Sequence, residues 1–250
     1  MSQSCVDVER DGSIVLIHLN RPPVNAIDTP LAEELERVLA GLETEPPGAV
    51  ILTGRGSCFS AGLDLKQFAG YSREDQDRLI QALNRMWLRL YGFPRPTIAA
   101  VNGHAIAGGM VNMLACDYRV GAEGNARFGL TEGQVGVAFP VSAKEIVLTE
   151  LGPSAARRIM LEAATDGPKA ALRDGALDEL QPPQRVLHRA MEVAKRTAQL
   201  PRGSYVTIKQ QIRGAALARI RRAVEENDDP LLGNWIGPEV PGAVARILGG

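Results

Sequence analysis

A glutamate in an apolar, glycine-rich segment is the side chain in this sequence best suited to proton transfer. Glu132 lies in residues 128–136, where glycines punctuate a largely apolar stretch. A carboxylate in such surroundings is poorly hydrated, which raises its pKa towards the range useful for proton transfer. A water-exposed residue at the start of a helix fits the same composition equally well. The local sequence therefore names a candidate base and leaves its environment open.

Two passages of the chain run from a buried strand through glycines into the start of a helix. In the first, strand 49–53 leads through the glycine-rich loop 54–62 to a helical start at residue 63. In the second, strand 97–101 leads to a helix over residues 110–116 that follows a pair of glycines. Helix starts carry unpaired backbone N–H groups. If the two starts converge, they would stabilise a developing oxyanion, so we expect chemistry that relies on backbone groups.

Motifs for other kinds of chemistry are incomplete. Residues 54–59 begin like the G-x-G-x-x-G fingerprint of dinucleotide-binding proteins, but Phe59 stands where the third glycine belongs. The next residues nearly match the serine hydrolase elbow, but Cys58 replaces its first glycine, so we interpret Ser60 as a loop residue. The three histidines and three cysteines lack the spacing of zinc ligands, and we expect no metal site.

The composition is that of an ordinary globular protein. The 250 residues include 28 Lys and Arg against 29 Asp and Glu, for a net charge of −1, and 45% of them are hydrophobic. These values exclude a disordered, collagen-like or coiled-coil chain, and we expect neither nucleic acid nor a membrane as a partner. No apolar run approaches the roughly 18 residues needed to cross a bilayer. The N-terminus has no signal or transit pattern, so we expect the protein in the cytoplasm.

The predicted elements alternate between strands and helices and then become almost entirely helical. Asp11-Gly12 indicates a hairpin turn, Thr29 is the predicted N-cap of the first long helix, and Ser72 with Asp75 forms a capping box for the next one. From Pro140 onward the pattern is helical. We therefore predict an α/β core over residues 1–195 and a helical C-terminal region over residues 196–250.

Three ordered motifs resemble the enoyl-CoA hydratase/isomerase (crotonase) family. They are CFSAGLDL at residues 58–65, AAVNGHAIAGG at residues 99–109 and CDYR at residues 116–119. The resemblance covers roughly residues 5–180. It implies an α/β fold, a crotonase-type spiral of repeated ββα units, with a C-terminal helical region that forms trimers. It also implies an acyl-CoA thioester as substrate, so that CoA belongs to the substrate and no separate cofactor is expected.

The resemblance also assigns functions to individual residues. The backbone N–H groups of Leu63 and Gly108 would hold the thioester carbonyl, and Glu132 would be the catalytic base. Lys66 would meet a CoA phosphate, although a solvated helix lysine is nearly as good an interpretation. The residues that would line the substrate site are Ala61, Gly62, Leu63, Asp64, Leu65, Lys66, Gly108 and Thr131.

The expected reaction follows from a glutamate that is missing. Hydratases of the family carry two glutamates, and the first would fall at Val111 here, while the second falls at Glu132. One glutamate suits an isomerase that moves the double bond of a 3-enoyl-CoA to the 2-trans position, and the chain looks most like the mitochondrial-type 3,2-trans-enoyl-CoA isomerases. The alternatives are an enoyl-CoA hydratase, another crotonase reaction, or a non-catalytic acyl-CoA-binding subunit.

The resemblance implies assembly as well, as a homotrimer or a dimer of trimers. A group of basic residues on the late helices would then either reach CoA phosphates of a neighbouring subunit or form a solvated helical face, which is the favoured interpretation. These residues are Lys209, Arg213, Arg219, Arg221 and Arg222.

Overall fold

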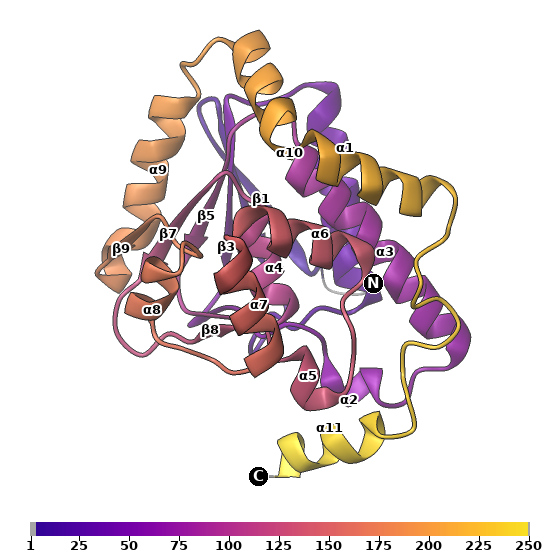
Figure 1. The fold of residues 1–250 in the computed structure, drawn as a ribbon. Coiled ribbons are helices and arrows are strands. Elements are labelled where there is room, and N and C mark those ends of the chain that lie inside the picture. The colour runs from indigo at the N-terminus through magenta and orange to yellow at the C-terminus, as the bar shows by residue number, and fades with distance from the viewer. Residues whose placement is uncertain (1–3, 250) are drawn as a thin grey trace.

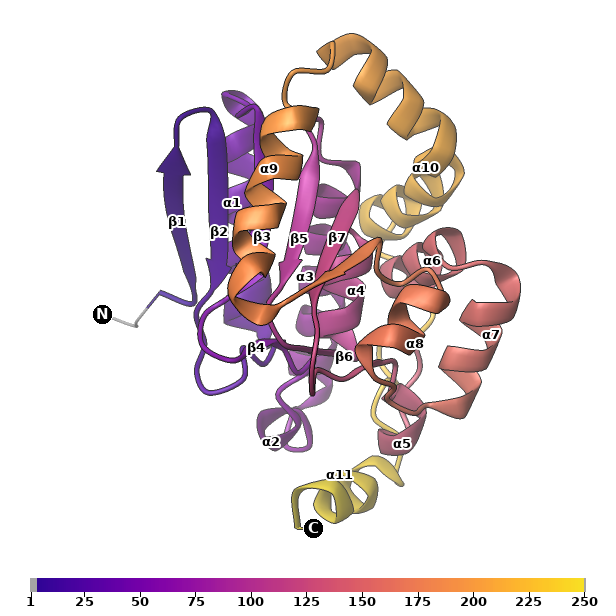
Figure 2. The ribbon, with the colours of Figure 1, turned by 90° about the vertical axis from the view of Figure 1, so that its left-hand side faces the viewer.

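A six-stranded sheet forms the larger framework of the molecule in the computed structural model, which describes residues 4–249 (Figures 1 and 2). Its strand order is β1-β2-β3-β5-β7-β9, and all neighbours are parallel except the predicted hairpin of β1 and β2. The bounds are β1 (Val6–Asp11), β2 (Ile14–Leu19), β3 (Ala49–Gly54), β5 (Thr97–Val101), β7 (Tyr118–Ala122) and β9 (Glu179–Gln181). Residues 1–3, where the N-terminal pattern considered above begins, and residue 250 lie outside the described range.

Both faces of the larger sheet are covered, as its apolar strands predict. Along β3, Val50 and Leu52 point into the main core, whereas Ala49 and Ile51 point into a second core on the opposite face. Helices α1 (Thr29–Thr44) and α3 (Arg73–Gly92) pack against each other and contribute to the main core, and α9 (Val186–Thr197) packs on β3, β5 and β7 to close the second one. The sheet is thus the middle layer of three (Figure 2).

A second, three-stranded sheet was not predicted, and it corrects the interpretation of residues 54–62 as a loop. It contains β4 (Cys58–Ser60), β6 (His104–Ile106) and β8 (Phe128–Gly129), in that order and all parallel. Ser60 is therefore a fully buried strand residue, with its hydroxyl donating to the carbonyl of Asn25. Strands of two or three residues are too short to show a hydrophobic period, and their partners lie far away in the sequence.

The expected ββα units are visible as a repeat between the two sheets. β3 and β4 precede α2 (Leu65–Phe68) and α3; β5 and β6 precede α4 (Gly108–Leu114); β7 and β8 precede α5 (Glu132–Val135). In each unit the first strand joins the larger sheet and the second joins the smaller one. The capping box at Ser72 and Asp75 is present at the start of α3, but Asp28, not Thr29, caps α1, with its side chain accepting from the Leu31 N–H.

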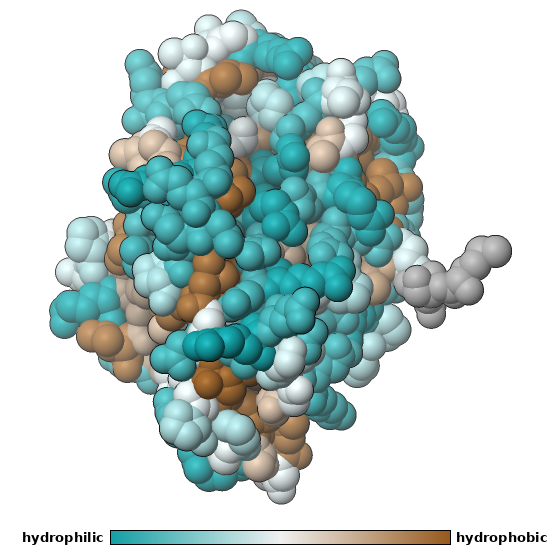
Figure 3. All heavy atoms as spheres, turned by 90° about the vertical axis from the view of Figure 1, so that its right-hand side faces the viewer, coloured by the Kyte–Doolittle hydropathy of each residue, from teal (hydrophilic) through white to brown (hydrophobic). Residues whose placement is uncertain are grey.

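The C-terminal half is mainly helical, with β9 as an unpredicted strand. α10 packs against α3 and α6, so it shares the main core, to which Leu217 and Ile220 contribute. The elements are α6 (Val141–Glu150), α7 (Pro153–Glu162), α8 (Pro168–Arg173), the short 3-10 turn Pro183–Arg185, α9, α10 (Arg202–Glu225) and α11 (Val240–Gly249). The face on the right of Figure 1 is mostly hydrophilic, with hydrophobic residues in small scattered patches (Figure 3). Within residues 4–249, no helix is long and apolar enough to span a membrane.

The basic residues of α10 are divided between the surface and the interior. Arg219, Arg221 and Arg222 are exposed, as a solvated face requires. Lys209 and Arg213 are buried, and both form ion pairs with Asp117, the residue just before β7. For these two the solvated-face interpretation is wrong, because their side of α10 faces the protein core.

Candidate active site

The three segments that carry the candidate residues leave the smaller sheet at its carboxyl edge. Leu63 follows the end of β4, Gly108 follows the end of β6, and Glu132 follows the end of β8. The strands are parallel, and although the register of β4 shifts between Cys58 and Ser60, Ser60 lies beside Ala105 and Ile106 beside Gly129, so their carboxyl ends coincide. Neighbouring strands are about 5 Å apart, which puts the outer two about 10 Å from each other. The carboxyl ends of parallel strands are also where α/β proteins commonly bind ligands.

The backbone at Leu63 presents an N–H group that is not used by the fold. Ile27 forms a parallel bridge with Leu63, in which the Ile27 N–H donates to the Gly62 carbonyl (2.7 Å) and the Asp64 N–H donates to the Ile27 carbonyl (2.9 Å). The groups of Leu63 itself point away from Ile27, because alternate residues of an extended chain face opposite sides. No acceptor for the Leu63 N–H occurs within residues 4–249.

The second candidate donor lies close to the first. Gly108 is the first residue of α4, where an N–H has no partner inside the helix, and no other acceptor for it occurs in the described part of the chain. A Cβ atom built on Gly62 would lie 3.2 Å from the Gly108 nitrogen and 2.7 Å from Ala107 Cβ. The structure therefore brings together the two segments whose N–H groups the resemblance assigns to an oxyanion hole.

Two glycines make this close approach possible. Gly62 has a φ of +82°, a left-handed conformation that side chains disfavour, and a side chain there would overlap Ala107. At Gly109 a Cβ would lie 2.2 Å from the Ser60 carbonyl oxygen, so any side chain would push α4 away from β4. These glycines thus allow the segment before α2 to approach the start of α4. The predicted helical start at residue 63 is wrong by two residues, because Leu63 lies in the bridge with Ile27 and α2 begins at Leu65, and the second helix begins at Gly108 and not at residue 110.

Glu132 is buried although it is the first residue of a helix. The residue is 8% exposed, its Oε2 atom has no hydrogen-bond partner in residues 4–249, and α5 is a single turn. Burial raises the pKa of the Glu132 carboxyl from 4.5 to about 7, against a smaller opposite effect of its own backbone. Of the two interpretations open in the sequence, the poorly hydrated carboxylate is correct. Such a group is suited to act as a base near neutral pH.

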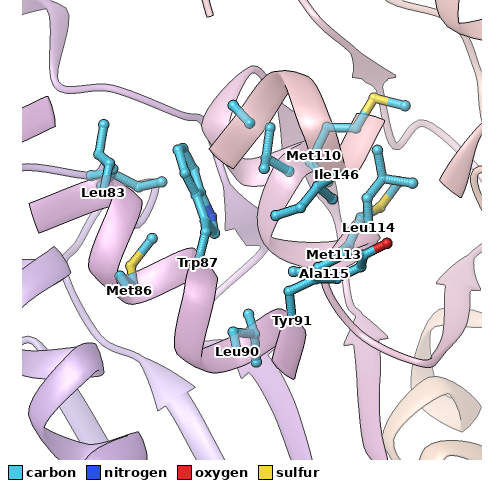
Figure 4. Packing of buried hydrophobic residues seen from close by; sticks show 14 of the residues in the cluster. Leu83, Met86, Trp87, Leu90, Tyr91, Met110, Met113, Leu114, Ala115 and Ile146 are labelled. Carbon is cyan, nitrogen blue, oxygen red and sulfur yellow. The ribbon is translucent and has the colours of Figure 1, made fainter. Parts of the chain in front are cut away.

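The position of the absent second glutamate is closed to water. Val111 is fully buried in α4, and the next residue, Asn112, is fully buried as well. Asn112 Oδ1 accepts a hydrogen bond from Trp87 Nε1 (2.6 Å), which fixes the indole in the core between α3 and α4 (Figure 4). The Cζ2 atom of Trp87 lies 3.6 Å from a Cβ built on Gly108, so the ring also borders the second donor. Neither Val111 nor Asn112 provides an acid or a base.

The remaining predicted substrate-site residues surround the loop before α2. Asp64 caps α2 by accepting from the N–H groups of Lys66 and Gln67, and it binds Arg21 (2.6 Å). Lys66 is exposed and available to a phosphate. Ala61, Leu65 and Thr131 are half-buried, the last as the residue that precedes α5. No group of three His, Cys, Asp or Glu side chains in the described residues is arranged to hold a metal ion.

Sequence reasoning missed several residues that support the site. Trp235, in the tail after α10, contacts Phe68 of α2 and the Ala138 carbonyl after α5. Ile27 bridges Leu63 and borders Gly108. A tryptophan beyond the residues that carry the family resemblance was a signal, but a sequence does not show which distant element such a ring will meet.

Comparison with known proteins identifies the family of this chain. A family model described as enoyl-CoA hydratase/isomerase matches residues 9–233. The chain belongs to this family. Among the relatives of this family, a putative enoyl-CoA hydratase from Thermus thermophilus is 37% identical over 199 residues, which is 77% of each chain. The human mitochondrial enoyl-CoA delta isomerase 1 is 30% identical over 219 residues, covering 86% of this chain and 72% of the human protein.

Solved structures of the family share the crotonase fold. The crystal structure of human mitochondrial delta3-delta2-enoyl-CoA isomerase superposes with a TM-score of 0.90 at 29% identity, covering 98% of this chain and 97% of that one. The expected spiral of ββα units is confirmed. Because similar relatives include both a hydratase and isomerases, membership of the enoyl-CoA hydratase/isomerase family gives the enzyme class and leaves the reaction to be argued from the site.

Proposed function

We propose that this enzyme is a 3,2-trans-enoyl-CoA isomerase with Glu132 as its only acid–base residue. The Glu132 carboxylate removes a proton from carbon 2 of a 3-enoyl-CoA, and the electron pair spreads over the diene and the thioester oxygen. The protonated Glu132 returns the proton to carbon 4, so the double bond moves from C3–C4 to C2–C3. Atoms and charge balance with no other reactant.

The observation that carries this proposal is the apolar environment at Val111. A hydratase must activate a water molecule, for which a second carboxylate is the usual means in this family. Val111 is fully buried, and Asn112 offers only an amide, whose oxygen accepts from Trp87, so this part of α4 supplies no carboxylate. A single desolvated carboxylate is sufficient for moving one proton between two carbons.

The backbone donors have a definite energetic function in the proposal. Negative charge develops on the thioester oxygen when carbon 2 loses its proton, and the N–H groups of Leu63 and Gly108 are the donors that would receive it. Removal of one such donor typically costs about 3–4 kcal/mol of transition-state stabilisation. The smaller sheet holds both segments in place before substrate arrives, so little reorganisation is needed.

Two substrates distinguish the candidate reactions. Purified protein is mixed with a 3-enoyl-CoA or with a 2-enoyl-CoA, and the absorbance of the conjugated thioester is followed. A rise with the first substrate and no loss with the second is the expected result. Loss with the second would instead identify a hydratase, and binding of both without change would identify a non-catalytic acyl-CoA-binding subunit.

The assignment of Glu132 is tested by Glu132→Gln, which keeps the shape of the side chain. Because general acid–base groups contribute about 100- to 10,000-fold, we expect turnover to fall by at least that lower factor. Acyl-CoA binding, measured by calorimetry, should be unchanged. Unaltered turnover would show that another group is the base.

Assembly into trimers, alone or in pairs, is a further part of the proposal. α10 carries Ile208 and Ile212 at 54% and 66% exposure, as a helix that packs against another subunit would. Light scattering on the purified protein should give three or six times the mass of one chain.

A further inference from the structure

The chain after α10 returns to the site as a strap. Residues 226–249, named the C-terminal strap here, leave the end of α10, pass along α3 and end in α11, which packs against both α2 and α5 (Figures 1 and 2). The strap is fastened at Asp229, which is 5% exposed. One oxygen of Asp229 accepts from the Asn84 amide and from the Val141 N–H, both at 2.8 Å.

Further contacts hold the middle of the strap to the start of α3. The Ile236 N–H donates to the Gln76 side chain (3.0 Å), and the Gly233 N–H donates to Asp77. Arg73 donates in turn to the Gly233 carbonyl. These bonds fix the strap on both sides of Trp235, so the position of this ring is determined by the rest of the fold.

Trp235 contacts the elements on both sides of the site. Its ring packs edge-on against Phe68 at the end of α2, with the ring centroids 5.0 Å apart. Its Nε1–H donates to the Ala138 carbonyl (2.8 Å), just beyond α5. α2 follows Leu63, one of the candidate donors, and α5 begins with Glu132. A single side chain, 4% exposed, therefore joins the segment of the donor to the segment of the base.

α5 depends on such contacts because it is only one turn long. A single turn has no stability of its own in water, so its neighbours decide its position. On one side, Gln134 donates to the Ala163 carbonyl at the end of α7 (2.6 Å). On the other side are Trp235 and Val240, which are both buried, and Glu239, whose Cγ lies 3.1 Å from a Cβ built on Gly136.

We propose that Trp235 is a positioning residue, which sets the distance between Glu132 and the donor at Leu63 and keeps water away from Glu132. This inference rests on the proposed function, because it takes Glu132 to be the base. Trp235 itself touches neither the carboxylate nor the donors, and acts through α2 and α5. Its aromatic ring contacts Phe68 of α2, and its N–H contacts the Ala138 carbonyl, in the segment that follows α5.

Nearby charges do not compete with this explanation. The ionisable residues on the two elements packed against α5 are Arg157, Arg158 and Glu162 of α7 and Arg246 of α11, with Glu239 just before α11. The shift of the Glu132 pKa comes from burial and from its own backbone, and none of these charges contributes to it. Admission of water is therefore the change that would move the titration of Glu132.

The test compares two substitutions of Trp235 with a control on the same strap. Trp235→Phe keeps a ring for Phe68 and loses the N–H donor, whereas Trp235→Ala loses both contacts. Ile247→Ala, on the exposed side of α11, is the control. For each protein we measure the melting temperature, the acyl-CoA dissociation constant, and kcat and kcat/KM for a 3-enoyl-CoA between pH 5.5 and 8.5.

We expect kcat to fall most in Trp235→Ala, by about 100-fold, since a misplacement of roughly 1 Å can cost that much, and to fall less in Trp235→Phe. In both, the acid limb of kcat/KM should move to lower pH, because a hydrated Glu132 titrates closer to 4.5. Ile247→Ala should match the parent protein. Hydrogen exchange should accelerate in α2 and α5 and remain unchanged in the larger sheet.

The outcomes separate this inference from the proposed function. If Trp235→Ala folds and has the kcat and the acid limb of the parent protein, the positioning role is overturned. If Trp235→Ala does not fold, the same result in Trp235→Phe overturns it. A lower kcat with an unmoved pH limb, and with exchange accelerated in the larger sheet as much as in α2 and α5, would also overturn it, as it would indicate general destabilisation. If instead the parent protein does not isomerise a 3-enoyl-CoA, or Glu132→Gln remains active, the proposed function itself fails.

Discussion

Glu132 and Asp117 are both carboxylates withdrawn from water, yet they titrate in opposite directions. No cation of residues 4–249 pairs with Glu132, and burial raises the pKa of its carboxyl to about 7. Burial acts on Asp117 in the same sense, but Lys209 and Arg213 outweigh it and hold the pKa of Asp117 below its usual range. The two residues belong to neighbouring parts of one spiral, so their difference comes from what the rest of the chain places beside them.

The cluster around Asp117 joins α10 to the core. Lys209 Nζ and Arg213 each contact Asp117 at 2.8 Å, and Arg213 Nε donates to Glu150 at 2.9 Å. The Tyr205 hydroxyl donates to Asp117 as well (2.7 Å). Arg213 also donates to backbone carbonyls, among them that of Cys116 (3.1 Å). Charges that are satisfied in this way are held in one arrangement and are not available to a substrate.

The comparison shows that burial has two uses in this fold. Where cations accompany the carboxylate, burial fixes the register of a long helix on the core. Where no cation lies beside the carboxylate, burial continues to disfavour its charged form, and the carboxylate takes up a proton readily. The following predictions test this contrast, from the largest expected effect on free energy to the smallest.

Removing a cation from the Asp117 cluster should destabilise the whole protein. We expect Arg213→Leu to lower the free energy of unfolding by about 3–5 kcal/mol, since it leaves Asp117 and Glu150, whose side chains are only 15% and 11% exposed, with too little compensating charge. Urea denaturation measures this loss. Arg221→Leu, at an exposed position of the same helix, is the matched control and should change stability little. If Arg213→Leu lowered the free energy of unfolding by less than about 1 kcal/mol, the cluster would not contribute to holding α10 on the core.

Neutralising Glu132 should raise the free energy of unfolding, whereas removing a cation beside Asp117 lowers it. A pKa raised from 4.5 to about 7 corresponds to about 3 kcal/mol against the charged form in the folded protein. The stability associated with protonated Glu132 is complete below pH 4.5 and is lost as the pH rises through 7. Glu132→Gln should therefore be more stable than the parent protein at pH 8 and about equal to it near pH 4. If the difference in stability between Glu132→Gln and the parent protein were the same at pH 4 and pH 8, the Glu132 carboxylate would not be desolvated.

The rate should follow the same ionisation. Only the carboxylate form of Glu132 can remove a proton, so kcat/KM should reach a plateau above pH 7 and fall about tenfold for each unit below it. The profile is measured on a 3-enoyl-CoA between pH 5.5 and 8.5. A rate that stays flat down to pH 5.5 would place Glu132 in water or assign the base elsewhere. Asp117, held in its charged form, should leave no trace in this profile.

An exposed ion pair between the last turn of α10 and the first residue of the C-terminal strap should have the smallest effect on stability. Arg222 and Glu226 lie 2.8 Å apart, with side chains 70% and 54% exposed. Their charges stay hydrated, so Glu226→Gln should change the free energy of unfolding by no more than about 0.5 kcal/mol. A change as large as that of Arg213→Leu would show that contact distance, and not burial, decides the strength of these pairs.

Local patterns in the sequence were sufficient for features that depend on neighbouring residues. The capping box of Ser72 and Asp75 forms because its two members are three residues apart on one turn. Strand β3 was identified by an apolar run that fits burial on both faces. Lys209 and Arg213 were misinterpreted because a helix pattern does not say which side will meet another element. The smaller sheet was missed because its strands are too short to show a period.

The sequence by itself determined the groups available for chemistry: Glu132, the glycines before Leu63 and at the start of α4, and Val111 where a second glutamate would stand. Their order also identified the family. Only the tertiary structure decided that the three segments leave one edge of the small sheet, that Glu132 is dry, and that Trp235 lies between α2 and α5. The reason is physical, since burial and approach depend on atoms contributed by residues far away along the chain.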